Sequence, residues 1–227
     1  MSKIIVAIDG PAASGKSTAA KELATRLGYV YLDTGAMYRA ITFLALRDGI
    51  DDNESAVIKM TRNLDLTLKF ENGITRVFAN DEEVTEYIRT PEVSNKVSEI
   101  SRISEVRKEL VRLQRNLAKK GSIVAEGRDI TTVVFPKADV KIYMTASADI
   151  RTERRYKEFL EKGMDVTYEE VSKLLNKRDE IDSGRKVSPL MKADDAVELD
   201  TTCLTVEQEL NKIVTLIKSV EEKSHQN

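Results

Sequence analysis

The sequence has very few of the residues that carry most redox and metal chemistry. Its 227 residues include one cysteine, Cys203, and one histidine, His225. A single cysteine excludes an internal disulfide and any CxxC site. Cys203 follows an apolar strand pattern, so we expect a buried or half-buried thiol and not a nucleophile, and His225 lies in a polar tail that we expect to fray. Histidine general-base chemistry and histidine metal sites are therefore effectively excluded.

Long apolar segments and a strong excess of one charge are missing as well. No apolar run approaches the roughly 18 residues that a membrane helix needs, and no signal peptide precedes the first strand pattern. Charged residues make up 33% of the chain, but the net charge is only -2, so no global field attracts nucleic acid. We therefore expect a cytoplasmic protein with no nucleic-acid or membrane partner. Separately from these absences, we expect a monomer that acts on small molecules.

The most informative stretch that is present runs from Gly10 to Ser17. It matches G-x-x-x-x-G-K-[ST] and lies between an apolar strand pattern at 4–8 and a helical pattern at 17–27. A loop so placed directs backbone N–H groups and a helix N-terminus at an anion. Lys16 is expected to reach the β- and γ-phosphates of a nucleoside triphosphate, and Ser17 is expected to hold Mg²⁺. The residues expected to bind ATP and Mg²⁺ are Gly10, Pro11, Ala12, Ala13, Ser14, Gly15, Lys16, Ser17 and Thr18.

Strand patterns alternate with helical patterns along the chain. The five apolar runs are 4–8, 29–32, 122–125, 140–144 and 196–199. Strands that alternate with helices predict a parallel sheet covered on both faces. We therefore expect a P-loop α/β fold of three layers, α/β/α, around a five-stranded parallel sheet. Ligands bind at the carboxyl ends of strands in such sheets, and polar residues and glycines gather at these ends here.

Two segments interrupt the alternation. Between about 62 and 87, apolar and polar residues alternate on both sides of Asn72-Gly73, which predicts an antiparallel hairpin. The segment 151–185 is heavily charged and is expected to form two helices joined by a turn at Lys162-Gly163. Such a composition suits a lid that closes over phosphates.

Several arginines follow the carboxyl ends of the strand patterns. Arg39 lies about one and a half helical turns beyond Asp33, where it either points back to the sheet edge or is solvated. Arg128 and Asp129 follow the third strand pattern, where the alternative to a binding role is an ion pair between these two neighbours. A further group has the spacing of one helix face, which suits either a solvated salt-bridge face or a cluster that faces phosphates. Its members are Arg178, Asp182 and Arg185.

One motif match is rejected by its context. The sequence Asn176-Lys177-Arg178-Asp179 matches the N-K-x-D motif with which GTPases read guanine, but here it continues an amphipathic helical pattern and does not follow a strand. The D-x-x-G switch motif is absent from the sequence as well. Both observations argue against a GTPase switch.

Stretches that span almost the whole chain, in order, match one family. They are 8–11 with 14–17, 32–39, 88–93, 106–107, 126–136, 177–179 and 199–202. In these stretches the chain resembles the bacterial cytidylate kinases of the P-loop nucleoside monophosphate kinases. The signatures at 33–39 and 127–136 are much more specific than the phosphate loop, and the antiparallel insert also fits this family. Departures are small, and they fall at Ser17, Thr34 and Glu126, where some members have Gly, Ser and Asp.

The resemblance implies transfer of the γ-phosphoryl group of ATP to CMP or dCMP with the help of Mg²⁺. It implies a single domain over 1–227, with a core at about 1–38, 99–150 and 186–227, a monophosphate-binding region at about 39–98 and a lid at about 151–185. The residues that it implies for the acceptor are Thr34, Arg39, Ser98, Arg107, Arg128, Asp129, Arg178, Asp182 and Arg185. The residues that it implies for catalysis are Lys16, Arg128, Arg151, Arg154, Arg155, Arg178 and Arg185.

Within the implied acceptor site, the roles differ. The α-phosphate would be held by Arg39, Arg128 and Arg185, and cytosine would be read by Ser98, Arg107 and Asp129. Arg178 and Asp182 would approach the sugar. The ATP phosphates would be approached by the lid residues Arg151, Arg154 and Arg155.

The residue types suit this chemistry on physical grounds. Phosphoryl transfer needs positioning and charge neutralisation more than covalent catalysis. Cytosine has an exocyclic amine, from which Asp129 can accept, and the acceptors O2 and N3, to which Arg107 and Ser98 can donate. Uracil reverses two of these positions. Two alternatives stay open: a kinase for another small acceptor such as UMP or shikimate, and a nucleotide-dependent switch or binding module.

Overall fold

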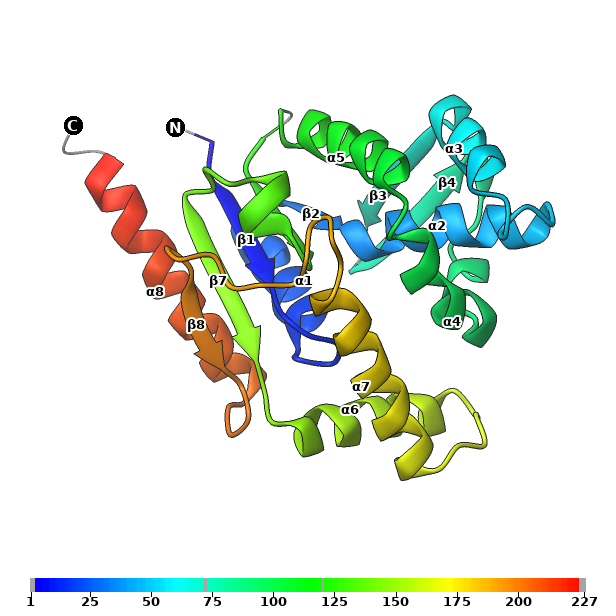
Figure 1. Ribbon diagram of the computed structural model, residues 1–227. Coiled ribbons are helices and arrows are strands. Elements are labelled where there is room, and N and C mark those ends of the chain that lie inside the picture. Colours follow the sequence, from blue (N-terminus) through cyan, green and yellow to red (C-terminus); the bar gives the residue numbers. More distant parts are fainter. Residues whose placement is uncertain (1–2, 72, 120, 225–227) are drawn as a thin grey trace.

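A five-stranded parallel sheet forms the centre of the protein in the computed structural model, which describes residues 3–71, 73–119 and 121–224 (Figure 1). The strand order is β2-β6-β1-β7-β8. The strands are β1 (Ile5–Asp9), β2 (Val30–Asp33), β6 (Ile123–Gly127), β7 (Val140–Thr145) and β8 (Val197–Asp200). The predicted α/β fold and its five parallel strands are confirmed, and each strand lies within one or two residues of its apolar run.

Helices cover both faces of this sheet. The helices of the described chain are α1 (Lys16–Leu27), α2 (Thr34–Arg47), α3 (Glu54–Asn63), α4 (Pro91–Ile100), α5 (Ser104–Ala118), α6 (Ala148–Glu161), α7 (Tyr168–Ser183) and α8 (Val206–Ser224), of which α6 and α7 do not lie on the sheet faces. Val6 and Ile8 of β1 share one buried core with α1 and α8, whereas Ala7 shares the other core with α2 and α5. Successive strand residues point to opposite faces, so the same strand contributes to both cores.

A second, antiparallel sheet extends from the α2 side. Its strands are β3 (Leu66–Glu71), β4 (Ile74–Ala79) and β5 (Glu82–Glu83), in that spatial order. Leu68 pairs with Val77 across the predicted hairpin, which is confirmed, and β5 is a short third strand that the pattern did not show. Asn72 lies outside the described residues, while Gly73 has a φ of 74°, the left-handed conformation that the hairpin turn favours.

The two helices expected between 151 and 185 are present and lie side by side at the carboxyl end of the central sheet (Figure 1). A capping box of Thr167 and Glu170 starts α7. Val171 and Leu175 of α7 pack against Ala12, so the segment expected to act as a lid touches the phosphate loop. α7 ends at Ser183, so Arg178 and Asp182 lie on the helix and Arg185 follows it.

Two short elements were not predicted, a 3₁₀ helix, η1 (Tyr87–Arg89), and a π-helical turn, η2 (Ile130–Val134). The carboxylate of Asp9, at the end of β1, accepts from the backbone N–H groups of Ile130 and Thr131 at 2.8 and 2.7 Å. Burial raises the pKa of Asp9 to about 6. These bonds fix the segment that leads out of β6 against the sheet.

Cys203 corrects one expectation, because its side chain is exposed and not buried or half-buried. It lies three residues past the end of β8, in the turn that leads to α8, where no layer covers it. Across the described part of the chain, no helix combines the length and the apolar composition that crossing a membrane requires.

Candidate active site

The phosphate loop has the backbone that its glycines were expected to provide. Gly10 has a φ of 152°, and a Cβ there would lie 1.9 Å from the carbonyl oxygen of Met144, so no other residue fits. Gly15 has a φ of 94° and is the N-cap of α1. The loop therefore approaches β7 closely and presents the N-terminus of α1, the geometry that binds an anion.

Lys16 lies under this loop and is almost fully buried. Its Nζ donates to the carbonyl oxygen of Pro11 at 2.6 Å and to the hydroxyl oxygen of Ser14 at 3.2 Å. Burial, with the nearby Arg128 guanidinium, lowers the pKa of Lys16 to about 7. A buried ammonium group in this place favours an anion that restores its charge balance.

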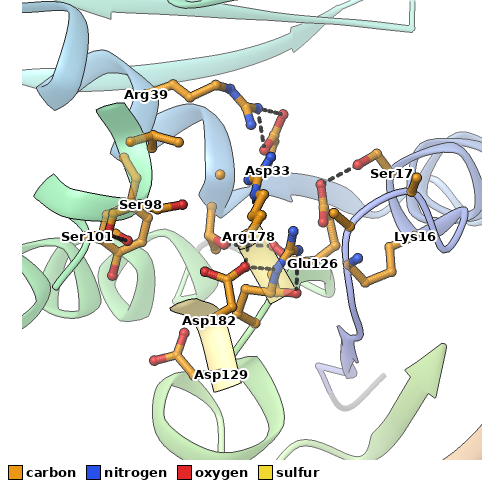
Figure 2. Close-up of a pocket in the computed structure, with 18 of the residues that line it drawn as sticks. Lys16, Ser17, Asp33, Arg39, Ser98, Ser101, Glu126, Asp129, Arg178 and Asp182 are labelled. Atoms are coloured by element: carbon orange, nitrogen blue, oxygen red, sulfur yellow. Dashed lines mark hydrogen bonds and ion pairs between the residues drawn. The ribbon is translucent and has the colours of Figure 1, made fainter. Parts of the chain in front are cut away.

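Ser17 and Glu126 form an oxygen-rich pair beside Lys16 (Figure 2). The Ser17 hydroxyl donates to Glu126 Oε1 at 2.7 Å, and the Tyr31 hydroxyl donates to the same oxygen at 3.3 Å. A hydroxyl and a carboxylate at the phosphate loop are the ligand types that Mg²⁺ uses, directly or through water. The residues present therefore fit a hydrated Mg²⁺ bound between protein and phosphates.

A cavity of about 120 Å³ opens between the phosphate loop, α2, α4 and α7. We call it the acceptor cavity. It lies at the carboxyl ends of β2 and β6, and Figure 2 shows polar side chains from several elements that converge on it. The residues that line it include Lys16, Ser17, Asp33, Thr34, Tyr38, Arg39, Ser98, Ser101, Arg107, Glu126, Arg128, Asp129, Arg155, Arg178, Asp182 and Arg185.

A buried ion pair forms one wall of the acceptor cavity. Arg107 of α5 donates to Asp129 Oδ2 at 2.5 Å and to the carbonyl oxygen of Ser101 at 3.0 Å, and both charged residues are only 3% exposed. The Arg107 guanidinium lies 5.1 Å from the centre of the Tyr38 ring. Ser98 of α4 lines the same wall. The pair is therefore held rigidly, with donors and an acceptor presented together.

Asp182 ties three arginines together in a neighbouring wall of the same cavity. Arg128 Nε donates to Asp182 Oδ2 at 2.8 Å, Arg185 donates to Oδ1, and Arg178 Nε lies 3.9 Å from Oδ2. Burial alone would raise the pKa of Asp182, but the guanidinium groups of Arg128 and Arg185 outweigh it and hold the pKa below its usual value. One carboxylate serves three cations, so this wall retains excess positive charge.

Asp33 and Thr34 fix the start of α2 at the cavity edge. Asp33 Oδ1 accepts from the backbone N–H of Ala36 at 2.8 Å and caps the helix, and Arg39 points back to Asp33 Oδ2 at 3.2 Å. Thr34 donates its hydroxyl to the carbonyl oxygen of Glu126 at 2.7 Å. The alternative in which Arg39 only solvates its helix is thus excluded.

A second cavity of about 490 Å³ adjoins the acceptor cavity at the phosphate loop, and the two share Lys16, Arg39 and Arg155 in their linings. We call it the donor cavity. Arg154 and Arg155 of α6 line it together with residues of the loop, including Thr18, and with Arg39 and Arg89. Arg154 donates to the hydroxyl and carbonyl oxygens of Thr201 at 3.0 and 2.9 Å.

Arg151 is placed differently from the other two lid arginines. It pairs with Asp179 and donates to the carbonyl oxygen of Ala12 at 3.3 Å, and it is not among the residues that line either cavity. Asp179 also accepts from the backbone N–H of Ala12 at 3.2 Å. Arg151 and Asp179 therefore fix the backbone of the phosphate loop at Ala12.

Comparison with known proteins fits this geometry. Residues 6–219 match the family model described as cytidylate kinase. The chain belongs to the cytidylate kinase family. A cytidylate kinase of Bacillus cereus strain G9842 is 49% identical over 219 residues, which cover 96% of this chain and 97% of the relative. A cytidylate kinase of Bacillus cereus strain B4264 is 48% identical over the same shares of both chains. A solved structure, an uncharacterized protein from Eubacterium ventriosum, shares the fold with a TM-score of 0.52 at 16% identity, over 96% of this chain and 99% of that one.

The site of this cytidylate kinase family member contains most of the side chains that the sequence singled out. Arg128 and Asp129 do not pair with each other, which rules out the ion pair between neighbours: Arg128 pairs with Asp182 and Asp129 with Arg107. The motif at 176–179 lies within α7, as expected, and does not follow a strand.

Sequence reasoning assigned no role to several residues that line the acceptor cavity. Glu126 carried a signal, since it directly precedes Gly127 at the end of a strand pattern, but its bond to Ser17 joins residues that lie 109 positions apart. Tyr38 and Ser101 carried none, because their place depends on how α2 and α4 pack beside α5. The hydroxyl of Tyr38 is buried and has no hydrogen-bond partner within the described residues.

Proposed function

We propose that this protein transfers the γ-phosphoryl group of ATP to CMP and dCMP and releases the corresponding diphosphate and ADP. The observation that carries the proposal is the buried Arg107–Asp129 pair, which faces the same cavity as Lys16. A phosphate-binding loop alone would suit many kinases. A fixed hydrogen-bond acceptor and fixed donors in the same cavity as the loop lysine suit a base of one hydrogen-bonding pattern.

Cytosine recognition follows from the donors and acceptors in this wall. Asp129 keeps an oxygen, Oδ1, free of the bond to Arg107, and it can accept from the exocyclic amine of cytosine. The Ser98 hydroxyl and Arg107 supply donors for O2 and N3. Uracil would face these groups with a carbonyl where cytosine has its amine, which leaves a buried acceptor unpaired at about 1–3 kcal/mol.

Charge neutralisation is the other task of the site. Arg39, Arg128 and Arg185 would hold the acceptor phosphate, and Lys16 with Arg154 and Arg155 would hold the phosphates of the donor. Of the donor and acceptor cavities, Arg178 lines the acceptor cavity only, and because burial and the charge of Arg128 lower its pKa to about 9, an anion bound in that cavity would stabilise its charged form. Arg151 would contact the phosphates of the donor only if its ion pair with Asp179 breaks.

Ser17 and Glu126 would hold Mg²⁺, Ser17 through its hydroxyl and Glu126 through water. The ion would supply charge neutralisation on the oxygens of the transferred group. Glu126 would keep the Ser17 hydroxyl oriented toward that position. The described residues contain no group of three His, Cys, Asp or Glu side chains that could hold a metal ion, so the proposal relies on phosphate oxygens and water for the remaining ligands.

The proposal also covers the organisation of the chain. The segment at about 39–98 would bind the monophosphate, α6 and α7 would close as a lid over about 151–185, and the remainder would form the core. We place the enzyme in the cytoplasm as a monomer that acts on small nucleotides and on no nucleic acid or membrane. Sedimentation or size-exclusion measurements would test the monomer.

A coupled assay of ADP release with CMP, dCMP, UMP and AMP tests the function directly. CMP and dCMP should be turned over well, UMP poorly and AMP least. Preference for UMP or for another acceptor would contradict the assignment of Asp129. Slow ATP hydrolysis that no acceptor accelerates would instead indicate a switch or binding module.

A further inference from the structure

Arg89 is a cationic residue at the site to which neither the sequence motifs nor the proposed function gives a task. It is the last residue of η1 and belongs to the stretch at 88–93 that matches the family. Arg89 lines the donor cavity with Lys16 and Ser17, and it lines a further cavity of about 60 Å³ together with Arg39, Arg155 and Arg178. Arg39 and Arg155 are shared by these cavities and the acceptor cavity. Arg89 therefore lies beside the junction of the donor and acceptor cavities.

The backbone that carries Arg89 is well fixed. Ile88 is fully buried in the core of the α2 side, and its N–H donates to the carbonyl oxygen of Val84 at 3.2 Å. The Tyr87 ring stacks on Phe43 of α2 with centroids 5.3 Å apart. Immediately after Arg89, Thr90 caps α4. The backbone of Arg89 is thus held in a defined position beside α2.

The guanidinium group of Arg89, in contrast, is weakly held. Within the described residues its one ion pair is with Asp33 Oδ2, at 3.7 Å, and its side chain is 40% exposed. Arg128 differs in both respects, with a carboxylate at 2.8 Å and 16% exposure. Asp33 is itself engaged by Arg39 at 3.2 Å and by the cap of α2. A long, half-exposed ion pair contributes little, so Arg89 can leave Asp33 at small cost.

A partner in the lid could offer an alternative explanation. Glu158 of α6 is the carboxylate that lines both cavities with Arg89. However, Glu158 already accepts from Arg155 at 2.7 Å with one oxygen and from Lys162 at 2.7 Å with the other. Both oxygens of Glu158 therefore have hydrogen-bond partners without Arg89, and an ion pair between Arg89 and Glu158 is not needed to explain Arg89.

We infer that Arg89 is a further phosphate-contacting residue, which donates to the phosphoryl oxygens where the donor and acceptor phosphates meet. This inference rests on the proposed function, because it needs a phosphorylated donor and a phosphorylated acceptor in adjacent cavities. The contact is a charge-assisted hydrogen bond and moves no proton. It supplies a positive charge beyond those of Lys16 and Arg39 at the point where negative charge accumulates.

Steady-state kinetics of Arg89→Ala, Arg89→Lys and Arg47→Ala test this role. Arg47 is a matched control, because it lies in the same region, is 43% exposed, has carboxylate partners and lines neither cavity. Arg89→Ala should lower kcat/KM for CMP by about tenfold to hundredfold, the loss expected for a hydrogen bond to a charged group. Arg89→Lys should recover part of the loss, since it keeps the charge but not the fork. Arg47→Ala should match the unchanged protein.

Binding measurements separate a junction contact from a purely structural effect. The probe is a bisubstrate analogue in which cytidine and adenosine are joined by five phosphates, and its affinity is compared with that of CMP alone. Arg89→Ala should weaken the analogue about tenfold or more and leave CMP nearly unchanged. Equal behaviour of Arg89→Ala and Arg47→Ala, or a loss confined to CMP alone, overturns the inference. Absence of CDP formation by the unchanged protein would instead refute the proposed function.

Discussion

The acceptor cavity and the donor cavity adjoin at one phosphate loop, but they are built differently. The acceptor cavity is small, about 120 Å³, and its arginines are fixed by buried carboxylates, Arg107 by Asp129 and Arg128 by Asp182. The donor cavity is about 490 Å³, and Arg154, one of its arginines, is 32% exposed. Base discrimination needs groups that are already in place, whereas triphosphate binding can rely on backbone N–H groups and on a lid that moves.

The electrostatics of the two sides follow the same division. In the acceptor cavity, one carboxylate serves Arg128, Arg178 and Arg185, so the excess positive charge can be relieved only by an anion. On the donor side, Lys16 is the buried cation, and the backbone carbonyl of Pro11 is its closest partner. Substitutions in the two regions should therefore fail in different ways, the first through recognition and the second through catalysis.

The largest effect is expected on the donor side. Lys16→Ala should lower kcat by at least about 10²–10³-fold, because its ammonium group offsets charge that develops in the transition state. The variant should remain folded, since no carboxylate is left unpaired around it. Kinetics with a parallel thermal unfolding measurement check both points. Near-normal turnover by a folded variant would refute the assignment of the loop.

Asp129→Asn should have the next largest effect and should act on selectivity. An amide at this place can donate as well as accept, so kcat/KM for CMP should fall about tenfold to hundredfold and the preference for CMP over UMP should shrink. The same change leaves Arg107 with a neutral partner in a buried place, so a lower melting temperature is expected too. The CMP to UMP ratio separates the two effects, because a change in stability alone leaves the ratio as it was.

Asp182 tests whether the acceptor wall reads the sugar or only fixes arginines. The sequence predicts that Asp182→Ala harms CMP more than dCMP, by about 1.5–3 kcal/mol, the value of one hydrogen bond between a charged group and the 2′-OH. The structure adds that both oxygens of Asp182 already accept from Arg128 and Arg185, so a large loss common to both substrates is expected. The measurement is kcat/KM for CMP and dCMP in both proteins. Equal losses would leave Asp182 as a residue that positions arginines.

Most of the fold could be predicted because its signals are local. Apolar runs located all five strands, the period-two pattern located β3 and β4, and the charged segment located α6 and α7. β5 and the turn η2 escaped, because β5 has two residues and η2 depends on Asp9, more than a hundred positions away. Cys203 was expected to be buried because it follows a strand pattern, but the exposure of a residue in the turn beyond β8 depends on how that turn packs.

The site could be predicted in its residue types but not in its pairings. The sequence and the family resemblance named Arg107, Asp129, Arg128 and Asp182, and the structure brings them to one cavity. Which carboxylate fixes which arginine depends on the packing of α5 and α7 against the sheet. Arg151 shows the limit most clearly. It is an arginine of the same charged segment as Arg154 and Arg155, but its position on α6 directs its side chain to Asp179.

The smallest effect concerns pH and again separates the two cavities. Burial and Arg128 lower the pKa of Lys16 to about 7, so the neutral amine gains population as the pH rises above that value. ATP favours the charged form, so binding above about pH 7 should take up a proton, and affinity should fall by at most about tenfold per pH unit. Stability without ligand should change in the opposite sense. The unfolded chain binds more protons between about pH 7 and 10, so the Lys16 contribution makes the folded state more stable with rising pH there.

Calorimetry of ATP binding in buffers of different ionisation enthalpy measures this proton uptake. Lys16→Met is the control, because it retains the titration of ATP itself and removes that of the lysine. CMP binding should show a weaker dependence over the same range, since the guanidinium groups of Arg128 and Arg185 remain charged. If ATP affinity had the same pH profile in Lys16→Met as in the unchanged protein, Lys16 would be charged throughout. The donor cavity would then be as fixed in its charge as the acceptor cavity, and the electrostatic contrast between them would be lost.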